Sequence, residues 1–76
     1  MSVKIYSTPS CVYCNMAKDY FRKNNIRYED YNVAGDVNKA EEMVRKSGQM
    51  GVPVIDINGK VIVGFNRNAV DKALHR

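Results

Sequence analysis

Residues 3–14 read VKIYSTPSCVYC and contain the most informative pattern in the chain. Its first part, Val3–Ser7, alternates apolar and polar side chains and is rich in β-branched and aromatic residues, which predicts a strand. Residues 8–10 interrupt this alternation with a proline. Ser10 is a suitable N-cap for a helix that begins around Cys11. The stretch therefore predicts a strand that leads directly into a helix, with two cysteines in the first helical turn.

The rest of the chain shows the same two kinds of pattern. Helical spacing of apolar residues occurs in three segments, namely 11–24, 37–47 and 67 to the C-terminus. Alternation of apolar and polar residues occurs in three others, namely 27–33, 54–57 and 60–63. Asn58-Gly59 joins the last two of these strands and is a strong signal for a tight hairpin with a type I′ turn.

The predicted elements follow one another in the order β-α-β-α-β-β-α. The first two strands are joined by a helix, so they pair in parallel through a right-handed crossover. The last two strands form an antiparallel hairpin. We therefore predict an α/β fold with a mixed four-stranded sheet and helices on both faces, in a single domain that takes up residues 1–76.

The composition argues against several other classes of protein. Hydrophobic residues make up 45% of the 76 positions, which is ordinary for a globular domain and unlike a disordered chain. No apolar run approaches the ~20 residues of a transmembrane helix, and the N-terminus lacks the shape of a signal peptide. We therefore expect a cytoplasmic protein that does not bind membranes. The net charge of +4 is spread along the chain among eight acidic residues, so no nucleic-acid partner is expected.

The chemistry of the chain centres on Cys11 and Cys14, its two cysteines. Helix N-termini carry unpaired N–H groups and the positive end of the helix dipole, which stabilise a thiolate. Residues three apart in a helix share one side, so Cys14 lies within disulfide reach of Cys11. A disulfide formed between Cys11 and a substrate can then be attacked by Cys14. This is the chemistry of a thiol–disulfide oxidoreductase.

Three other roles for the two cysteines carry less weight. A bridge that closes a four-residue loop removes little entropy from the unfolded chain, so it is a poor structural staple. A closed zinc site needs four ligands, and this chain offers Cys11, Cys14 and His75 unless two chains combine. Two inert buried thiols would suit a non-catalytic binding or adaptor module. No metal and no tightly bound organic cofactor are expected.

Val52-Pro53 is a second notable feature. A proline at the first position of a buried strand either punctuates the strand or has a functional role. Together with the cysteine motif it contributes to a resemblance that covers nearly the whole chain. The residues that carry it are Tyr6, Cys11-Val12-Tyr13-Cys14, Glu41-Glu42-Met43, Ser47-Gly48, Gly51-Val52-Pro53 and Gly64-Phe65. On these residues the chain resembles the glutaredoxin family, and within it the short group that includes the NrdH redoxins.

The resemblance implies a thioredoxin-like fold and a dithiol mechanism in which Cys11 is the exposed nucleophile and Cys14 the resolving thiol. Pro53 would be a cis-proline beside them, and the backbone of Val52 would pair with the main chain of a disulfide substrate. Tyr13 would line the groove, although an ordinary, partly exposed helix residue would look the same in the sequence. Phe65 would either line the groove or join the core. The implied partners are disulfide-containing proteins, and the expected form is a monomer.

The resemblance is compatible with two electron donors. Glutathione would be the co-substrate of a glutaredoxin, and its contacts would be Tyr13, Gln49, Val52, Gly64 and Asn66. Family members that use glutathione typically carry a lysine three residues before the first cysteine, and a Gly-Gly pair followed by a small residue and an aspartate. This chain has Thr8 and Val63-Gly64-Phe65-Asn66 instead. Gly64-Phe65 is closer to the NrdH-like pattern, whose members take electrons from thioredoxin reductase, a flavoprotein.

Overall fold

The computed structural model describes residues 2–75, and within this range the elements follow the predicted order. The strands are β1 (Val3–Ser7), β2 (Glu29–Asn32), β3 (Val54–Ile57) and β4 (Lys60–Val63). The helices are α1 (Val12–Lys23), α2 (Val37–Ser47) and α3 (Arg67–Ala73). The last helix ends at Ala73, with Leu74 as its C-cap, and does not continue toward the C-terminus as expected, because His75 has a positive φ of 61°. Residue 76 of the expected range lies outside the described residues. No helix in the described range has the length and hydropathy needed to cross a membrane.

The strands form one mixed sheet in the order β2-β1-β3-β4. The inner strand β1 pairs in parallel with β2 and antiparallel with β3, and β3 and β4 form the antiparallel hairpin. Ser7 lies opposite Asn32. Val54 lies opposite both Tyr6 and Val63. The register therefore brings together the C-terminal ends of β1, β2 and β4 and the N-terminal end of β3. We call this end of the strands the site end of the sheet.

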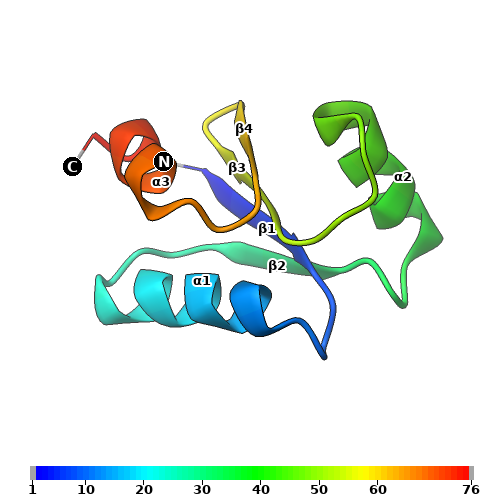
Figure 1. Ribbon diagram of the computed structural model, residues 1–76, viewed down its shortest axis with the longest axis horizontal. Coiled ribbons are helices and arrows are strands. Elements are labelled where there is room, and N and C mark those ends of the chain that lie inside the picture. Colours follow the sequence, from blue (N-terminus) through cyan, green and yellow to red (C-terminus); the bar gives the residue numbers. More distant parts are fainter. Residues whose placement is uncertain (1, 76) are drawn as a thin grey trace.

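Helices cover both faces of the sheet, as predicted (Figure 1). Under α1 and α3 lies one core, made of Val3, Ile5, Ala17, Phe21, Ile55, Ile57, Ile62, Val70, Ala73 and Leu74. Under α2 lies a smaller core of Tyr6, Met43 and Val54. Neighbouring residues of β1 and β3 belong to different cores, because successive side chains of a strand point to opposite faces.

Two turns adopt the backbone conformations that their sequences predict. Asn58 and Gly59 have φ angles of 53° and 91°, and a type I′ turn requires positive values at both positions. Gly48 ends α2 with a φ of 75° and donates its N–H to the carbonyl of Val44 at 2.8 Å. Each of these conformations depends on a few adjacent residues, so the local sequence was sufficient to predict it.

Three other local predictions were wrong in detail. The N-cap of α1 is Cys11 rather than Ser10, because the Cys11 sulfur accepts the backbone N–H of Cys14. The second strand is shorter than residues 27–33, because β1 pairs with four residues of this segment. The helical spacing of Val37, Ala40, Met43 and Val44 predicts that Val37 faces the sheet, but Val37 is 73% exposed. Helical periodicity shows the direction of an apolar face and not how far the underlying sheet extends.

A cluster of charged and hydroxyl groups lies between α2 and the sheet. Lys46 Nζ donates to Asp56 Oδ2 at 2.7 Å and to the Tyr6 hydroxyl at 2.8 Å, and Tyr6 in turn donates to Glu42. Asp56 Oδ1 also accepts the backbone N–H of Gly59 at 2.8 Å. Burial alone would raise the pKa of Asp56, but the hydrogen bonds from Lys46 and Gly59 outweigh it and lower this pKa below 3.8.

We expect acid to weaken the fold through Asp56 and Glu42. The hydrogen bond from Tyr6 is the main cause that lowers the pKa of Glu42 below 4.5. Both carboxyls bind protons less readily in the folded chain than in the unfolded chain. Their stabilisation is therefore complete above the ordinary pKa values and is lost as pH falls through the folded-state values, below about pH 4. Urea unfolding at about pH 6 and about pH 2.5 measures this loss.

The Asp56→Asn variant serves as the control for this pH dependence. It removes one of the two titrating groups and keeps an oxygen that can accept the N–H of Gly59. The variant is expected to be less stable than the wild type near neutral pH and to lose less free energy of unfolding on acidification. An equal loss in the two proteins would show that Asp56 does not contribute to the acid sensitivity.

Candidate active site

Cys11 and Cys14 are joined by a disulfide where α1 begins, at the site end of the sheet. Their Cα atoms are 5.2 Å apart, because a helical spacing of three brings both residues to one side. Cys11 is partly exposed, whereas Cys14 is completely buried. An incoming sulfur can therefore reach Cys11 and not Cys14. Within residues 2–75, no group of three or more His, Cys, Asp or Glu side chains is arranged to hold a metal ion.

The backbone around Cys11 is suited to a negative charge on sulfur. The N–H of Cys14 points at Cys11 Sγ from 3.1 Å, and this contact caps the helix. The first turn of α1 contains no acidic residue, and the N-terminal end of a helix carries a partial positive charge. Once the disulfide is reduced, a Cys11 thiolate would keep this N–H donor and would meet no carboxylate from its own helical turn.

The segment before β3 also belongs to the site end. The peptide bond between Val52 and Pro53 is cis, as the resemblance implied. Pro53 is buried, and its carbonyl accepts the backbone N–H of Gly64 at 2.8 Å. Because Val54 pairs with Tyr6 in β1, Pro53 lies at the same end of the sheet as the segment that leads to Cys11. The topology thus brings together three predicted parts of the site that are distant in sequence.

The main chain of Val52 is open to a partner. Among the residues that the structure describes, none forms a hydrogen bond with its N–H or its C=O. Unpaired main-chain groups beside a sheet can accept an extended peptide as an added strand. The geometry of Val52 therefore suits the role that the resemblance implied for it.

Large apolar side chains are exposed on α1 and on the loop before Pro53. On α1 they are Val12, Tyr13 and Met16, with Tyr13 63% exposed. On the loop before Pro53, Met50 is 79% exposed. Large exposed apolar side chains are typical of surfaces that contact other proteins. The exposure of Met50 could not be predicted from the sequence, because an isolated methionine in a loop has no periodic pattern.

Gln49, which was expected to contact glutathione, uses its side chain within its own loop. The Nε2 atom donates to the carbonyl of Gly51 at 3.1 Å, and the Oε1 atom accepts the N–H of Gly51. The Nε2 atom also lies 3.4 Å from the Ser47 hydroxyl. These contacts could not be predicted from the resemblance, because they depend on how the loop turns back on itself.

Asn66, the second polar residue expected to contact glutathione, also has an internal partner. Its Oδ1 atom accepts the backbone N–H of Ala69 at 3.2 Å and caps α3. Gly64, next to it, has a φ of 80° and donates its N–H to Pro53, so it ties the end of β4 to the segment before β3. A glycine adopts this positive φ without strain.

Phe65 packs against the core and also borders a cleft. Its ring centroid lies 5.8 Å from that of Tyr20, and the ring is partly buried against the core under α1 and α3. The cleft has a volume of about 390 Å³ and lies beside α1 and the start of α3. Met16 and Arg67 are among its other lining residues. Phe65 therefore takes a position at the edge of the core, and no other residue predicted for the substrate groove lines this cleft.

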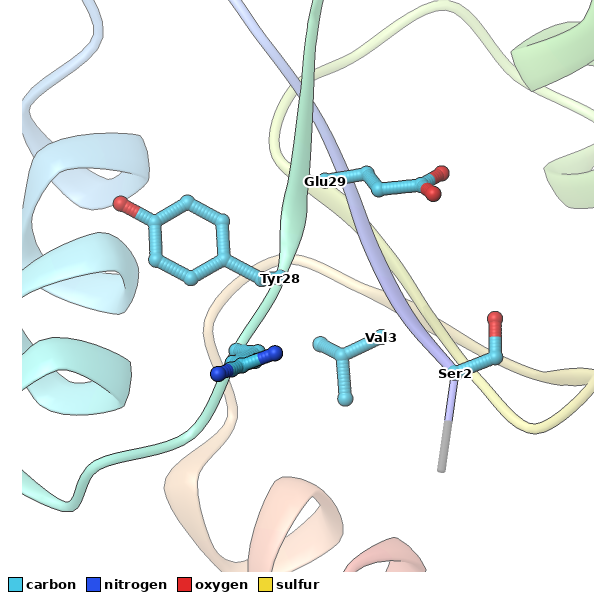
Figure 2. A pocket seen from close by; sticks show the side chains of 5 residues that line it. Ser2, Val3, Tyr28 and Glu29 are labelled. Carbon is cyan, nitrogen blue, oxygen red and sulfur yellow. The ribbon is translucent and has the colours of Figure 1, made fainter.

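A second cleft, of about 260 Å³, lies at the opposite end of the sheet and is shown in Figure 2. Its lining residues are Ser2, Val3, Arg27, Tyr28 and Glu29. In Figure 2 the Tyr28 ring points toward α1 and the Glu29 carboxylate points away from it. Val3 begins β1, whereas Cys11 follows the end of that strand, so this cleft is remote from the disulfide. No predicted site residue lines it.

Comparisons with known proteins agree with this geometry. The profile of the Glutaredoxin family matches residues 3–62. A glutaredoxin-like 8.6 kDa protein in the rubredoxin operon of Clostridium pasteurianum is 49% identical over 74 residues, which are 97% of this chain and 99% of that protein. Glutaredoxin 3 of Escherichia coli is 33% identical over 63 residues, which are 83% of this chain and 76% of that protein. The solved structure of the E. coli NrdH-redoxin has a TM-score of 0.80 and 26% identity, and the match covers 95% of this chain and 93% of that one. The sheet and helices described above form the thioredoxin-like fold.

Proposed function

The chain belongs to the glutaredoxin family, and we propose that it is a dithiol–disulfide oxidoreductase that reduces disulfides in other proteins. The observation that carries this proposal is the disulfide at the N-terminus of α1, with Cys11 partly exposed and Cys14 buried. The unpaired main chain of Val52 and the exposed apolar side chains of the site end support a protein substrate. Tyr13 and Pro53 would form part of the same binding surface.

The proposed reaction begins with the reduced protein. The Cys11 thiolate attacks one sulfur of the substrate disulfide, so a new S–S bond forms between Cys11 and that sulfur. The substrate S–S bond breaks, and its second sulfur leaves as a thiolate that takes up a proton. The N–H of Cys14 holds the attacking sulfur in place at the start of the helix.

The second step releases the substrate. The Cys14 thiol gives up its proton and attacks Cys11 Sγ, which forms the Cys11–Cys14 bond. The sulfur of the substrate that was bound to Cys11 leaves as a thiolate and is protonated. The substrate has then gained two electrons from the two cysteines and two protons, of which Cys14 supplies one and water the other. The disulfide in the structure corresponds to this oxidised product.

We further propose that a flavoprotein reductase, and not glutathione, returns the dithiol to its reduced form. Glutathione carries two carboxylates and one ammonium group at neutral pH. Thr8 is uncharged, the Gln49 amide is bonded to Gly51, and the Asn66 carbonyl is bonded to Ala69. None of these three positions offers a free charged group to glutathione. The E. coli NrdH-redoxin, a similar structure, is described as having a thioredoxin-like activity profile.

The test is a choice between two electron sources with insulin disulfides as the substrate. Turnover with NADPH and bacterial thioredoxin reductases is expected to exceed turnover with glutathione and glutathione reductase by at least about tenfold, equivalent to about 1.4 kcal/mol. Alkylation of the reduced protein after denaturation confirms that both thiols are present. Faster turnover with glutathione would assign glutathione as the donor, and contacts from Tyr13, Gly64 and Asn66 would then have to form on binding.

The same experiment tests whether the chain is an enzyme at all. Thiols that resist alkylation near neutral pH, together with no turnover from any donor, would support a non-catalytic adaptor.

We propose that the enzyme works as a cytoplasmic monomer, with residues 1–76 as one domain. Both cysteines come from one chain, so the dithiol reaction needs no second copy.

A further inference from the structure

The side chain of Gln49 forms hydrogen bonds with both polar groups of the Gly51 backbone. Its Nε2 atom donates to the carbonyl of Gly51 at 3.1 Å, and its Oε1 atom accepts the N–H of the same residue. One amide group therefore satisfies both polar backbone atoms of Gly51. A paired contact of this kind restrains a loop more than a single hydrogen bond, because it fixes the orientation of the peptide groups as well as one distance.

The end of α2 holds Gln49 itself. The Ser47 hydroxyl donates to the carbonyl of Met43 at 2.7 Å and is also within 2.9 Å of the carbonyl of Gln49. Gly48 adopts a left-handed conformation and closes the helix on the carbonyl of Val44. Ser47 therefore links Gln49 to the C-terminal end of α2. Through the Gln49 side chain, Gly51 is in turn tied to this helix.

On the other side of Val52, the chain is held by β4. The carbonyl of Pro53 accepts the N–H of Gly64 at 2.8 Å. Val52 therefore lies between two restrained residues, Gly51 and Pro53, while its own N–H and C=O have no partner among residues 2–75. This is the arrangement expected of main-chain groups that are held ready for an incoming strand.

We infer that Gln49 is a positioning residue that orients the main chain of Val52 for the peptide backbone of a disulfide substrate. The inference rests on the proposed function, because it concerns the same binding surface. It gives Gln49 a role that differs from contact with glutathione. Its effect should appear with substrates that have a peptide backbone, since a small disulfide without peptide groups has nothing to pair with Val52.

Gly51 provides an independent way to break the same contact. A Cβ atom on Gly51 would lie 2.7 Å from Gln49 Oε1, which is closer than such contacts allow. Its other near contact within 4 Å is Gln49 Cδ, at 3.8 Å. Gly51→Ala should therefore displace the Gln49 amide and little else. In a chain that already carries Gln49→Ala, the added methyl group should find space and have little further effect.

The experiment uses chemically reduced protein in single-turnover reactions, so that no electron donor is needed. Two rate constants are measured, one for a disulfide-bonded peptide and one for hydroxyethyl disulfide, which has no peptide groups. The ratio of the first to the second is expected to fall about fivefold to tenfold in Gln49→Ala and in Gly51→Ala, the size of one or two net hydrogen bonds. The double variant should match Gln49→Ala alone. Asn38→Ala, a surface amide on α2, is the matched control and should keep the wild-type ratio.

The outcomes separate this inference from the proposed function. If the reduced wild type reacts with neither disulfide, the proposed function fails. If the wild type reacts with both and the ratio does not change in Gln49→Ala, the proposed function stands and the inference is overturned. An equal fall of both rates would also overturn it, because that result would point to a general loss of structure. Additive effects of Gln49→Ala and Gly51→Ala would contradict the shared contact.

Discussion

Replacing Cys11 with serine is expected to abolish disulfide reduction, with a loss of at least about a thousandfold in the rate, as for other residues that supply the nucleophile. The effect is chemical and not structural, because serine is a favourable N-cap and its oxygen can accept the N–H of Cys14 that the Cys11 sulfur accepts now. The variant should therefore keep its circular dichroism spectrum and melting temperature. The reduction of insulin disulfides with a saturating donor measures the loss.

Cys14→Ser is the matched variant with a different expected result. The first step, attack by Cys11, needs no sulfur at position 14, so this variant should form a mixed disulfide and then stop. Mass spectrometry of the mixture should show one substrate molecule attached through Cys11, and added dithiothreitol should release it. Full dithiol activity in Cys11→Ser, or a substrate molecule bound at position 14 in that variant, would reverse the assigned roles.

Replacing Phe21 with alanine is expected to cost about 3–5 kcal/mol of unfolding free energy, the range for deletion of a buried aromatic side chain. Phe21 lies on the inner face of α1 and is completely buried, and its ring centroid lies 5.6 Å from that of Tyr28 and 6.2 Å from that of Tyr20. Alanine would leave a cavity between the helix and the sheet. Small domains are stable by about 5–15 kcal/mol, so a loss of this size would leave a substantial part of the protein unfolded at moderate temperature.

Urea unfolding followed by circular dichroism measures this loss, and two variants serve as controls. Phe21→Leu keeps most of the apolar volume and should cost clearly less than Phe21→Ala. Val37→Ala changes an exposed residue and should alter stability by no more than about 0.5 kcal/mol. If Phe21→Ala were as stable as Val37→Ala, the packing of α1 on the sheet would have to differ from the structure described here.

Much of the fold could be predicted because its signals are local. Periodicity identified α2, β3 and β4 with the bounds that the structure has. The Asn58-Gly59 turn follows from the ease with which these residues adopt positive φ. The parallel pairing of β1 and β2 follows from the helix that must connect them. These features depend on steric and hydrogen-bonding preferences within short segments. They can therefore be predicted from the residues of each segment alone.

Other features depend on contacts between segments, and the sequence did not reveal them. Val37 has the helical spacing of an inward residue, but its exposure depends on what lies opposite it. Lys46 and Asp56 are ten residues apart in the sequence. The ion pair between them forms because α2 packs on the face of the sheet toward which the Asp56 side chain of β3 points. A charged residue in a helix has the same sequence pattern whether it faces water or a buried carboxylate.

For the site, the local sequence was sufficient to predict the reactive pair. Cys11 and Cys14 at a strand-to-helix junction predict a dithiol, because spacing and the helix terminus are local properties. The tertiary structure decided which groups surround that dithiol and how they are used. It placed Val52 at the same end of the sheet with an unpaired main chain, and it engaged Gln49 and Asn66 in contacts with their own backbone. The physical reason is that a polar side chain takes the partner that folding brings within reach, and the sequence does not record that distance.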